Sequence, residues 1–308
     1  MTQILEPRDY SKNAIAVYRS LGKVYFGPKP RRDAEILVVR LRYRIDGAML
    51  DKMPHLTIIA SPTTGMNHID VKEAQRRGIK IISLRGRTGF LRKIPSTAEL
   101  TWGLLLALVR KIPASHEHVK AGGWNRDLFR GHQLCGKTLG ILGYGRLGKI
   151  VGRYGRAFGM KVIACDPVIS AGRMKRLGSR KVSMERLFRE ADIISVHVLL
   201  TEKTHNLVKT KHLRMMKPTA YLINTSRGEI IEKGALEKAL AQKWIAGAAV
   251  DVLWDERGNG AHLRGNPLRR YAMTHDNLIL VPHTGGATYE AMAITEDFIA
   301  ALVKKAVR

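Results

Sequence analysis

The chain has 308 residues, of which 45% are hydrophobic and 26% charged, a balance that excludes an intrinsically disordered chain and predicts about two folded domains. With only two cysteines, a disulfide-stapled miniprotein is also excluded. The 53 Lys and Arg residues outnumber the 26 Asp and Glu residues, for a formal net charge of +27, which raises the question of an anionic partner.

The positive charge is distributed along the chain rather than confined to a tail. Residues 1–97 carry 19 Lys and Arg against 8 Asp and Glu, and residues 98–286 carry 31 against 15. Aromatic residues, on which nucleic-acid bases often stack, make up only 6%. We therefore predict a basic, solvated surface, with nucleic-acid binding only through non-specific charge.

No segment predicts a membrane span or a secretory signal. The longest apolar run, residues 102–109, is far shorter than the roughly 20 residues that cross a bilayer. The N-terminus lacks the basic and apolar regions of a signal peptide, and Cys135 and Cys165 are the only cysteines. We expect a cytoplasmic protein.

The first region predicts alternating strands and helices. Residues 35–41 contain a short β-branched apolar run, which is typical of a buried parallel strand. Similar runs follow at residues 56–60 and 80–83, and the helix-like segment 71–77 separates them. This spacing predicts βαβ units.

The second region begins with a helix and continues as a series of strands. Ser96 and Glu99 are spaced as a capping box before the apolar segment 100–110, so we expect a helix that Ser96 caps. A final amphipathic helix is expected over residues 290–305. Helix-like stretches separate most of the six strand-like segments, which predicts a doubly wound parallel sheet with its functional loops at the carboxyl ends of the strands. These segments are residues 138–142, 161–165, 191–196, 220–224, 245–251 and 278–281.

A glycine-rich motif follows the segment 138–142 directly. It reads Gly143-Tyr144-Gly145-Arg146-Leu147-Gly148 and opens a helix, which is the context that a dinucleotide-binding turn requires. The glycines permit a tight turn, close approach of a pyrophosphate and close helix–strand packing. Asp166, 23 residues after Gly143, can accept hydrogen bonds from the ribose hydroxyls and would repel a 2′-phosphate. We therefore predict that these residues bind NAD, with NADP disfavoured.

Four further polar residues follow predicted strands of the second region. A guanidinium at the position of Arg227 can hold a carboxylate with two parallel hydrogen bonds. Thr225, at the same strand end, is predicted to border the cofactor. Glu256 and His283 could form a proton-transfer pair across one cleft. From spacing alone, Arg227 could equally be a surface charge, and nothing establishes that Glu256 and His283 meet.

Together these motifs resemble the D-isomer-specific 2-hydroxyacid dehydrogenases, a family that includes 3-phosphoglycerate dehydrogenases. The resemblance runs from residues 64–70 through residues 136–148 to residues 282–286, and we expect no additional regulatory domain after the final helix. It implies that Arg227 binds the substrate carboxylate and carbonyl and that His283 is the acid/base. It also implies that Glu256 orients His283 and favours its charged form.

The same resemblance assigns further residues to the cofactor and the substrate. Asp251 resembles the aspartate that faces the nicotinamide carboxamide. The backbone at Thr64 and Gly65 resembles the loop that binds the substrate carboxylate. Arg42 occupies a position similar to the arginine that meets the substrate phosphate in phosphoglycerate dehydrogenases, and Arg44 is a second candidate.

The resemblance also implies two Rossmann-like domains with a cleft between them. Residues 1–97 and 287–308 would form a discontinuous substrate domain, and residues 98–286 the NAD-binding domain. We therefore predict an NAD-dependent oxidoreductase that transfers hydride between the nicotinamide and C2 of a D-2-hydroxy acid or 2-oxo acid, with 3-phosphoglycerate as one candidate. The resemblance further implies a homodimer, and we predict no metal.

Two other functions stay open at this point. The first is a nucleotide-sensing, corepressor-like binding protein on the same fold, and the second is a basic nucleic-acid-binding protein. The presence of Arg227, Glu256 and His283 together argues against a purely binding role.

Two positions depart from the family's pattern. Arg257 follows Glu256, and Val198 follows His197, where the family usually has proline in each case. The long interval from Glu256 to His283 predicts a surface insertion, which begins with residues 257–261.

Overall fold

The computed structural model describes residues 1–6, 9–258 and 260–307 and divides into two compact units. Unit 1 comprises Met1–Ile94, Arg257–Ala261 and Ala287–Arg308, and unit 2 comprises Pro95–Glu256 and His262–Gly286. The division at 94/95 differs from the predicted boundary at 97/98. The short segment 257–261, expected in the second domain, groups with unit 1.

Unit 1 is built on a five-stranded parallel sheet in the order β2-β1-β3-β4-β5. Chain order reverses between β1 and β3, so their carboxyl ends form the topological switch point, where ligands bind in open α/β sheets. The strands are β1 (Thr2–Ile4), β2 (Val24–Phe26), β3 (Ile36–Val38), β4 (Ile58–Ser61) and β5 (Lys80–Ser83).

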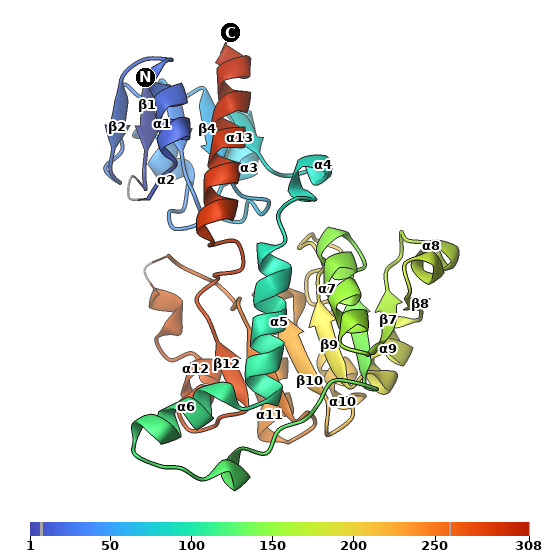
Figure 1. The fold of residues 1–308 in the computed structure, drawn as a ribbon. Helices are drawn as coiled ribbons and strands as arrows, with labels where there is room; N and C mark the ends of the chain where they lie inside the picture. Colours follow the sequence, from blue (N-terminus) through green and yellow to red (C-terminus); the bar gives the residue numbers. More distant parts are fainter. Residues whose placement is uncertain (7–8, 259, 308) are drawn as a thin grey trace. The chain divides into compact units, whose positions relative to one another are not determined.

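Helices cover both faces of this sheet (Figure 1). They are α1 (Lys12–Arg19), α2 (Gly47–Leu50), α3 (Val71–Arg76), α4 (Thr88–Leu91) and α13 (Tyr289–Val307). On one face α1 lies along α13, with Tyr18 and Ile299 in a shared core. On the other face Leu50 and Ala74, from α2 and α3, pack with Ile59. Successive strand residues therefore contribute to opposite cores, as the pleat of a strand requires.

Unit 2 contains a seven-stranded parallel sheet in the order β12-β11-β10-β9-β6-β7-β8. Its chain order reverses between β6 and β9, which places a second topological switch point there. The strands are β6 (Thr138–Leu142), β7 (Lys161–Cys165), β8 (Arg180–Lys181), β9 (Ile193–Val196), β10 (Tyr221–Asn224), β11 (Gly247–Val250) and β12 (Leu278–Leu280).

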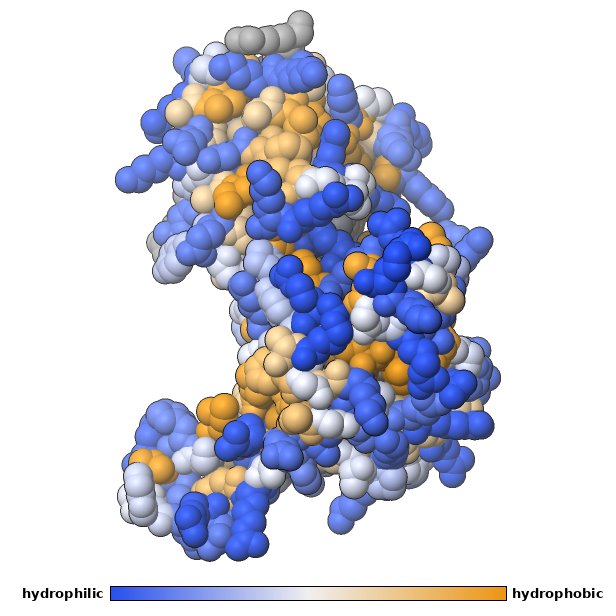
Figure 2. Space-filling model, turned by 45° about the vertical axis from the view of Figure 1, so that its right-hand side comes forward, coloured by the Kyte–Doolittle hydropathy of each residue, from blue (hydrophilic) through white to orange (hydrophobic). Residues whose placement is uncertain are grey.

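The helices of unit 2 lie on both faces of its sheet. They are α5 (Ser96–Val109), α6 (Ile112–Lys120), α7 (Arg146–Ala157), α8 (Ala171–Arg176), α9 (Met184–Glu190), α10 (Thr210–Arg214), α11 (Ala235–Ala241) and α12 (Pro267–Ala272), with short 3₁₀ turns at Arg126–Phe129, Gly228–Ile230 and Ala261–Leu263. Hydrophilic side chains cover much of the face drawn in Figure 2.

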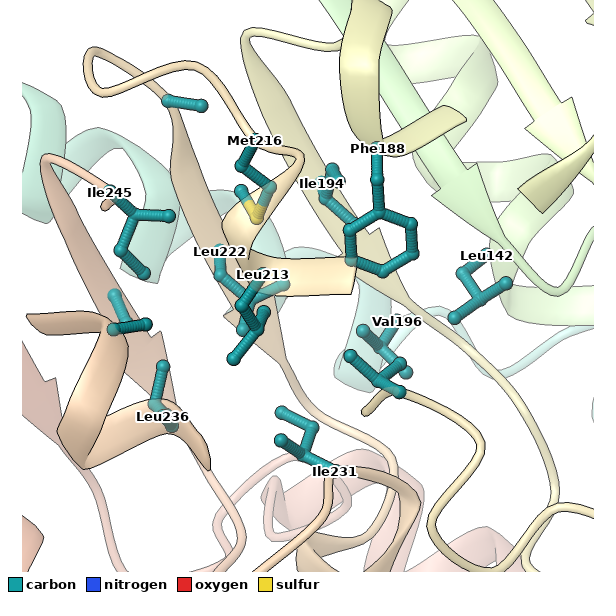
Figure 3. Packing of buried hydrophobic residues seen from close by; sticks show 14 of the residues in the cluster. Leu142, Phe188, Ile194, Val196, Leu213, Met216, Leu222, Ile231, Leu236 and Ile245 are labelled. Carbon is teal, nitrogen blue, oxygen red and sulfur yellow. The ribbon is translucent and has the colours of Figure 1, made fainter. Parts of the chain in front are cut away.

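Two apolar cores hold these helices to the sheet. Trp102 and Val151, from α5 and α7, pack on one face. Phe188, Leu213 and Leu236, from α9, α10 and α11, pack on the other face (Figure 3). This arrangement is the predicted doubly wound sheet. In the part of the chain that the structure describes, no helix has both the length and the apolar character needed to cross a bilayer.

The predicted elements differ from the observed ones mainly at their ends. The segments 80–83, 138–142 and 161–165 coincide with β5, β6 and β7. Strands β1, β2 and β8 are not predicted from the sequence, because none of them lies in an apolar run of four or more residues. The equally short β3 and β12 do lie in such runs.

The predicted capping box at Ser96 is wrong. The N-cap residue of α5 is Pro95, whose carbonyl oxygen accepts hydrogen bonds from the backbone N–H groups of Ala98 and Glu99. Ser96 is already helical, so its hydroxyl is not at the position from which a cap reaches the first free amides.

Candidate active site

The glycine-rich motif lies at the topological switch point of unit 2. It joins β6 to α7, next to the carboxyl end of β9. Gly143 has a φ of +91°, and a Cβ there would lie 2.6 Å from the carbonyl oxygen of His197. A Cβ at Gly148 would lie 2.2 Å from the carbonyl oxygen of Gly143. Only glycine therefore fits at these two positions.

The turn leaves open space at the N-terminus of α7. Gly145 is the N-cap residue, no side chain caps the helix, and a Cβ at Gly145 would meet nothing within 4 Å. Arg146 and Leu147 form the first turn and are partly buried, and burial lowers the pKa of Arg146. Because a helix N-terminus presents backbone N–H groups and a positive dipole end, these residues fit the pyrophosphate of a dinucleotide.

Asp166 lies at the end of β7, beside the glycine turn. Its Oδ2 accepts a hydrogen bond from the backbone N–H of Tyr144 at 2.8 Å. Its Oδ1 accepts hydrogen bonds from the backbone N–H groups of Val168 at 2.8 Å and Ile169 at 3.1 Å. These three bonds hold the carboxylate in place and leave Oδ2 one further lone pair for a ribose hydroxyl.

Two predicted cofactor residues direct their side chains into the protein. Tyr144 is fully buried, and its hydroxyl lies 2.6 Å from that of Ser179. The hydroxyl of Thr225 lies 2.9 Å from that of Thr101 on α5. At the glycine turn, Tyr144 therefore contributes its backbone and not its phenol.

The structure brings His283 and Glu256 together. His283 Nδ1 lies 2.5 Å from Glu256 Oε2, and Glu256 Oε1 accepts a hydrogen bond from the backbone N–H of Leu253 at 2.8 Å. Burial raises the pKa of Glu256, but the hydrogen bond and charge of His283 outweigh burial, so the pKa is lowered overall. An ionised carboxylate only accepts hydrogen bonds, so Nδ1 carries the proton and Nε2 is the nitrogen that can exchange a proton with a substrate.

Asp251 holds the loop that carries His283. The residue is 1% exposed, and its carboxylate accepts hydrogen bonds from the backbone N–H groups of Thr284 at 2.6 Å and Gly285 at 2.9 Å. Burial raises the pKa of Asp251, and these two bonds oppose the effect. His283 has a φ of +55°, which is uncommon for a residue other than glycine. Asp251 thus positions the histidine, and its contact with a nicotinamide stays a prediction.

Arg227 lies in a tight turn that the side chain of Asn224 organises. Asn224 Nδ2 donates to the carbonyl oxygen of Arg227 at 2.9 Å, and Asn224 Oδ1 accepts from the backbone N–H of Ser226 at 3.0 Å. A Cβ at Gly228 would lie 2.2 Å from the carbonyl carbon of Leu253. The turn therefore packs directly against the chain that leads to Glu256. The sequence analysis missed Asn224 and Ser226, although both stand in the segment that it singled out.

Arg227 and Glu256 lie close enough for the charge of each to affect the pKa of the other. Burial lowers the pKa of Arg227, and nearby carboxylates, that of Glu256 foremost, oppose the effect. The guanidinium stays protonated, because an arginine side chain is not deprotonated in proteins. Its Nη1 donates to the carbonyl oxygen of Ser226 at 2.6 Å. Unit 2 thus holds a fixed cation and an acid/base pair, which suits binding a carboxylate and polarising a carbonyl.

The arginines predicted to meet a substrate belong to unit 1, at the carboxyl end of β3. Arg40 forms an ion pair with the buried Glu296. Arg44 is 83% exposed and lies 3.8 Å from Asp46. Arg42 makes no ion pair within 4 Å to any carboxylate of the described residues. Exposed ion pairs are weak, so the contact of either Arg42 or Arg44 with an anionic ligand stays a prediction.

Glu6 is a residue of this edge that the sequence analysis missed. It follows β1 at the switch point of unit 1, and its Oε2 accepts a hydrogen bond from the backbone N–H of Arg40 at 2.9 Å. Burial raises the pKa of Glu6, and the backbone and charge of Arg40 and Arg42 oppose the effect. Glu6 therefore holds the start of the loop that carries Arg42. The signal for Glu6 in the sequence is a carboxylate that follows a strand. That strand, β1, has only three residues and is not predicted.

Thr64 and Gly65 follow β4 in a turn that hydroxyl groups shape. Thr63 Oγ1 donates to the carbonyl oxygen of Gly65 at 2.8 Å and lies 2.9 Å from Ser61 Oγ. Ser61 Oγ also lies 3.3 Å from His68 Nε2. Thr64 itself is exposed. The predicted substrate-binding residues Thr64 and Gly65 belong to unit 1 with Arg42, whereas the predicted catalytic residues belong to unit 2.

Comparison with known proteins decides the family. Residues 102–285 match the family model described as D-isomer specific 2-hydroxyacid dehydrogenase, NAD binding domain. The chain belongs to this family. It is therefore an NAD-dependent oxidoreductase acting on 2-hydroxy or 2-oxo acids, and its two parallel-sheet units are the Rossmann-like domains of D-2-hydroxyacid dehydrogenases.

Individual members of the family cover most or all of the chain. A glyoxylate reductase from Thermococcus litoralis is 36% identical over 276 residues, which cover 87% of this chain and 79% of that protein. A D-3-phosphoglycerate dehydrogenase from Methanocaldococcus jannaschii is 33% identical over 317 residues and matches all of this chain, which spans 58% of that protein. The crystal structure of Aquifex aeolicus D-lactate dehydrogenase with NAD and lactic acid has a TM-score of 0.85 and 27% identity, covering 100% of this chain and 95% of that one.

Proposed function

We propose that this dehydrogenase interconverts a short 2-oxo acid of the glyoxylate type and its D-2-hydroxy acid with NADH and NAD. The observation that carries the proposal is the 2.5 Å hydrogen bond between His283 and Glu256 in the unit that also holds Arg227. Glyoxylate reductases are prominent among the relatives that match the chain.

In this proposal Arg227, His283 and Glu256 have different roles in the reaction. Arg227 binds the substrate carboxylate and stabilises the charge that develops on the carbonyl oxygen during reduction. His283 gives a proton from Nε2 to that oxygen during reduction and removes the hydroxyl proton during oxidation. Glu256 keeps the ring oriented and favours its protonated form. The bound cofactor supplies or accepts the hydride.

NADH is proposed as the preferred cofactor because Asp166 lies beside the glycine turn. Its carboxylate can accept hydrogen bonds from the ribose hydroxyls, and its negative charge disfavours the 2′-phosphate of NADPH.

A phosphorylated acid such as 3-phosphoglycerate is a second candidate substrate, and one observation favours it. Arg42 carries a charge without an ion-pair partner within 4 Å among the described residues, and a guanidinium binds phosphate well. The matching phosphoglycerate dehydrogenase also extends over the whole chain.

A homodimer is proposed from the exposed apolar residues of one segment of unit 2. Helix α6 has no buried residue, and it projects from the sheet of unit 2 (Figure 1). Ile112, Val119, Leu128 and Trp124 are exposed on this segment, Trp124 to 90%. Exposed apolar side chains on one projecting segment are typical of a protein interface, and a second copy that places the same segment against the first would cover them.

The function is tested by following NADH oxidation with glyoxylate, hydroxypyruvate, 3-phosphohydroxypyruvate and pyruvate. We expect turnover, and we expect His283→Ala to lower kcat by about 100- to 10,000-fold while NADH binding, measured by fluorescence, is unchanged. His275→Ala, at an exposed histidine of unit 2, is the control and should keep its activity. A loss below about tenfold would remove His283 from acid/base catalysis. Intact NADH binding without turnover of any acid would favour the corepressor-like alternative.

The same assay separates the two substrate candidates. If a phosphate meets Arg42, Arg42→Ala should lower kcat/KM for 3-phosphohydroxypyruvate far more than for glyoxylate. Arg32→Ala, at an exposed arginine of unit 1 that is not a substrate candidate, is the control. Equal losses on both substrates would leave the unphosphorylated acid as the proposed substrate.

A further inference from the structure

Much of the positive charge of unit 2 comes from one stretch of the chain. Residues 146–189 carry 12 Lys and Arg against two Asp and Glu. The stretch forms α7, β7, α8, β8 and most of α9, at the end of the sheet where β8 is the last strand. Within unit 2, a large share of the net positive charge therefore lies at one edge of the sheet.

Six exposed cations make up this surface, which we call the basic edge. They are Arg153, Arg156, Lys161, Arg173, Lys175 and Arg176. None of the six forms an ion pair within 4 Å to a carboxylate of the described residues. By contrast, Arg180 and Arg186, their neighbours in the chain, are both paired with Glu190.

The two helices of the basic edge meet at one glycine. A Cβ at Gly178, in the turn after α8, would lie 2.7 Å from Cδ of Arg156 on α7. Arg153 lies one turn before Arg156 on α7, and Arg173 lies one turn before Arg176 on α8, so each pair shares a helix face. Figure 2, which turns this side of unit 2 forward, shows strongly hydrophilic side chains gathered on it.

We propose that the basic edge binds the phosphodiester backbone of nucleic acid without reading its sequence. Arginines without an ion-pair partner bind phosphate oxygens with two parallel hydrogen bonds. Each phosphate neutralised in this way releases counterions condensed on the nucleic acid, which favours binding. The edge has few exposed aromatic groups for stacking on bases. Phe158, which is exposed there, lies stacked on Trp102 with ring centroids 4.6 Å apart.

The same observations disfavour an anionic membrane as the partner. A stable peripheral attachment usually combines charge with an inserted apolar anchor or an amphipathic helix. Phe158 is held flat against Trp102, and α8 has only six residues. Val168 and Leu177 are the other exposed large apolar residues of this stretch. Neither lies within a helix, so the basic edge lacks the amphipathic helix of such an attachment.

The test is fluorescence anisotropy of a labelled 20-base-pair DNA duplex, titrated with the full chain between 50 and 200 mM salt. We expect binding that weakens steeply with salt, because each neutralised phosphate contributes about −0.9 to the slope of log K against log salt. The variant Arg153→Gln/Arg156→Gln/Arg176→Gln should reduce that slope by about 3 in magnitude. Its turnover of 2-oxo acids should stay unchanged, because none of the three residues belongs to the active site.

The control variant is Lys203→Gln/Lys211→Gln/Lys243→Gln, which removes the same charge from exposed positions away from the basic edge. It should change the slope by less than 1. Equal effects of the two variants, no binding at 50 mM salt, or binding to phosphatidylserine vesicles in preference to DNA would each overturn the proposal. If the first variant fails to fold, Arg173→Gln/Lys175→Gln provides the same comparison with an expected change of about 2.

Discussion

A single hydrogen bond connects the protonation of His283 to Glu256. The bond and the charge of His283 lower the pKa of Glu256 against the opposing effect of burial. The ionised carboxylate is in turn an anionic hydrogen-bond partner for the protonated imidazole. His283 must be protonated for reduction, so Glu256 extends the pH range of the reductive reaction toward alkaline pH.

Glu256→Gln should therefore move the descending arm of the reductive pH profile toward acid. The measurement is kcat against pH under conditions where chemistry limits the rate. Asp255→Asn, next in the chain and exposed, is the control. An unmoved arm in Glu256→Gln would mean that this carboxylate does not govern the protonation of His283.

Asp166 has two roles that substitutions can separate. Its carboxylate accepts a hydrogen bond from the backbone of the glycine turn, and its negative charge disfavours a 2′-phosphate. Asp166→Asn keeps an oxygen that can accept hydrogen bonds while removing the charge, whereas Asp166→Ala removes both. We expect Asp166→Asn to raise the ratio of NADPH to NADH affinity, since the repulsion of the 2′-phosphate is lost. Dissociation constants of both cofactors check this, and an unchanged ratio would reject Asp166 as the discriminating residue.

At the scale of elements, the loop after β3 is held from two sides. Glu6 binds the backbone of Arg40 on one side. On the other side the segment Arg257–Ala261 returns to unit 1, and a Cβ at Gly258 would lie 2.1 Å from the carbonyl oxygen of Arg42. The predicted insertion after Glu256 is thus a contact element for the loop that carries Arg42.

Gly258→Ala should displace the Arg42 loop, because backbone atoms cannot yield as a flexible side chain does. If the proposed phosphate contact is correct, we expect KM for 3-phosphohydroxypyruvate to rise by about tenfold or more, the equivalent of about 1.4 kcal/mol. The NADH dissociation constant should not change. Gly89→Ala, where a Cβ meets nothing within 4 Å, is the control. An unaltered KM in Gly258→Ala would show that this contact does not position Arg42.

At the scale of the whole molecule, the exposed apolar segment after α5 leads to a prediction about assembly. Trp124→Glu/Leu128→Glu should convert the proposed homodimer to a monomer, because it places charge in an interface that must exclude water. Sedimentation velocity of both proteins measures this. Met273→Glu, at another exposed apolar residue of unit 2, is the control. A parent chain that is monomeric at micromolar concentration would contradict the homodimer.

Local patterns in the sequence determined much of unit 2. The Gly143–Gly148 turn is recognisable because its glycines are required within six residues, directly after a buried strand. The strands β6 and β7 are apolar runs long enough to be identified with their correct ends. The positions of Arg227, Glu256 and His283 at strand ends made them candidates, although spacing could not show that they act together.

Only the tertiary structure decided which of these groups are partners. The bond from His283 to Glu256 joins residues 27 apart, and the ion pair of Arg40 with Glu296 joins residues 256 apart. Neighbouring arginines look alike in the sequence, yet Arg40 and Arg44 have carboxylate partners while Arg42 has none within ion-pair distance among the described residues. The physical reason is that such contacts depend on the order of strands in each sheet, and hydrophobic periodicity carries no information about that order.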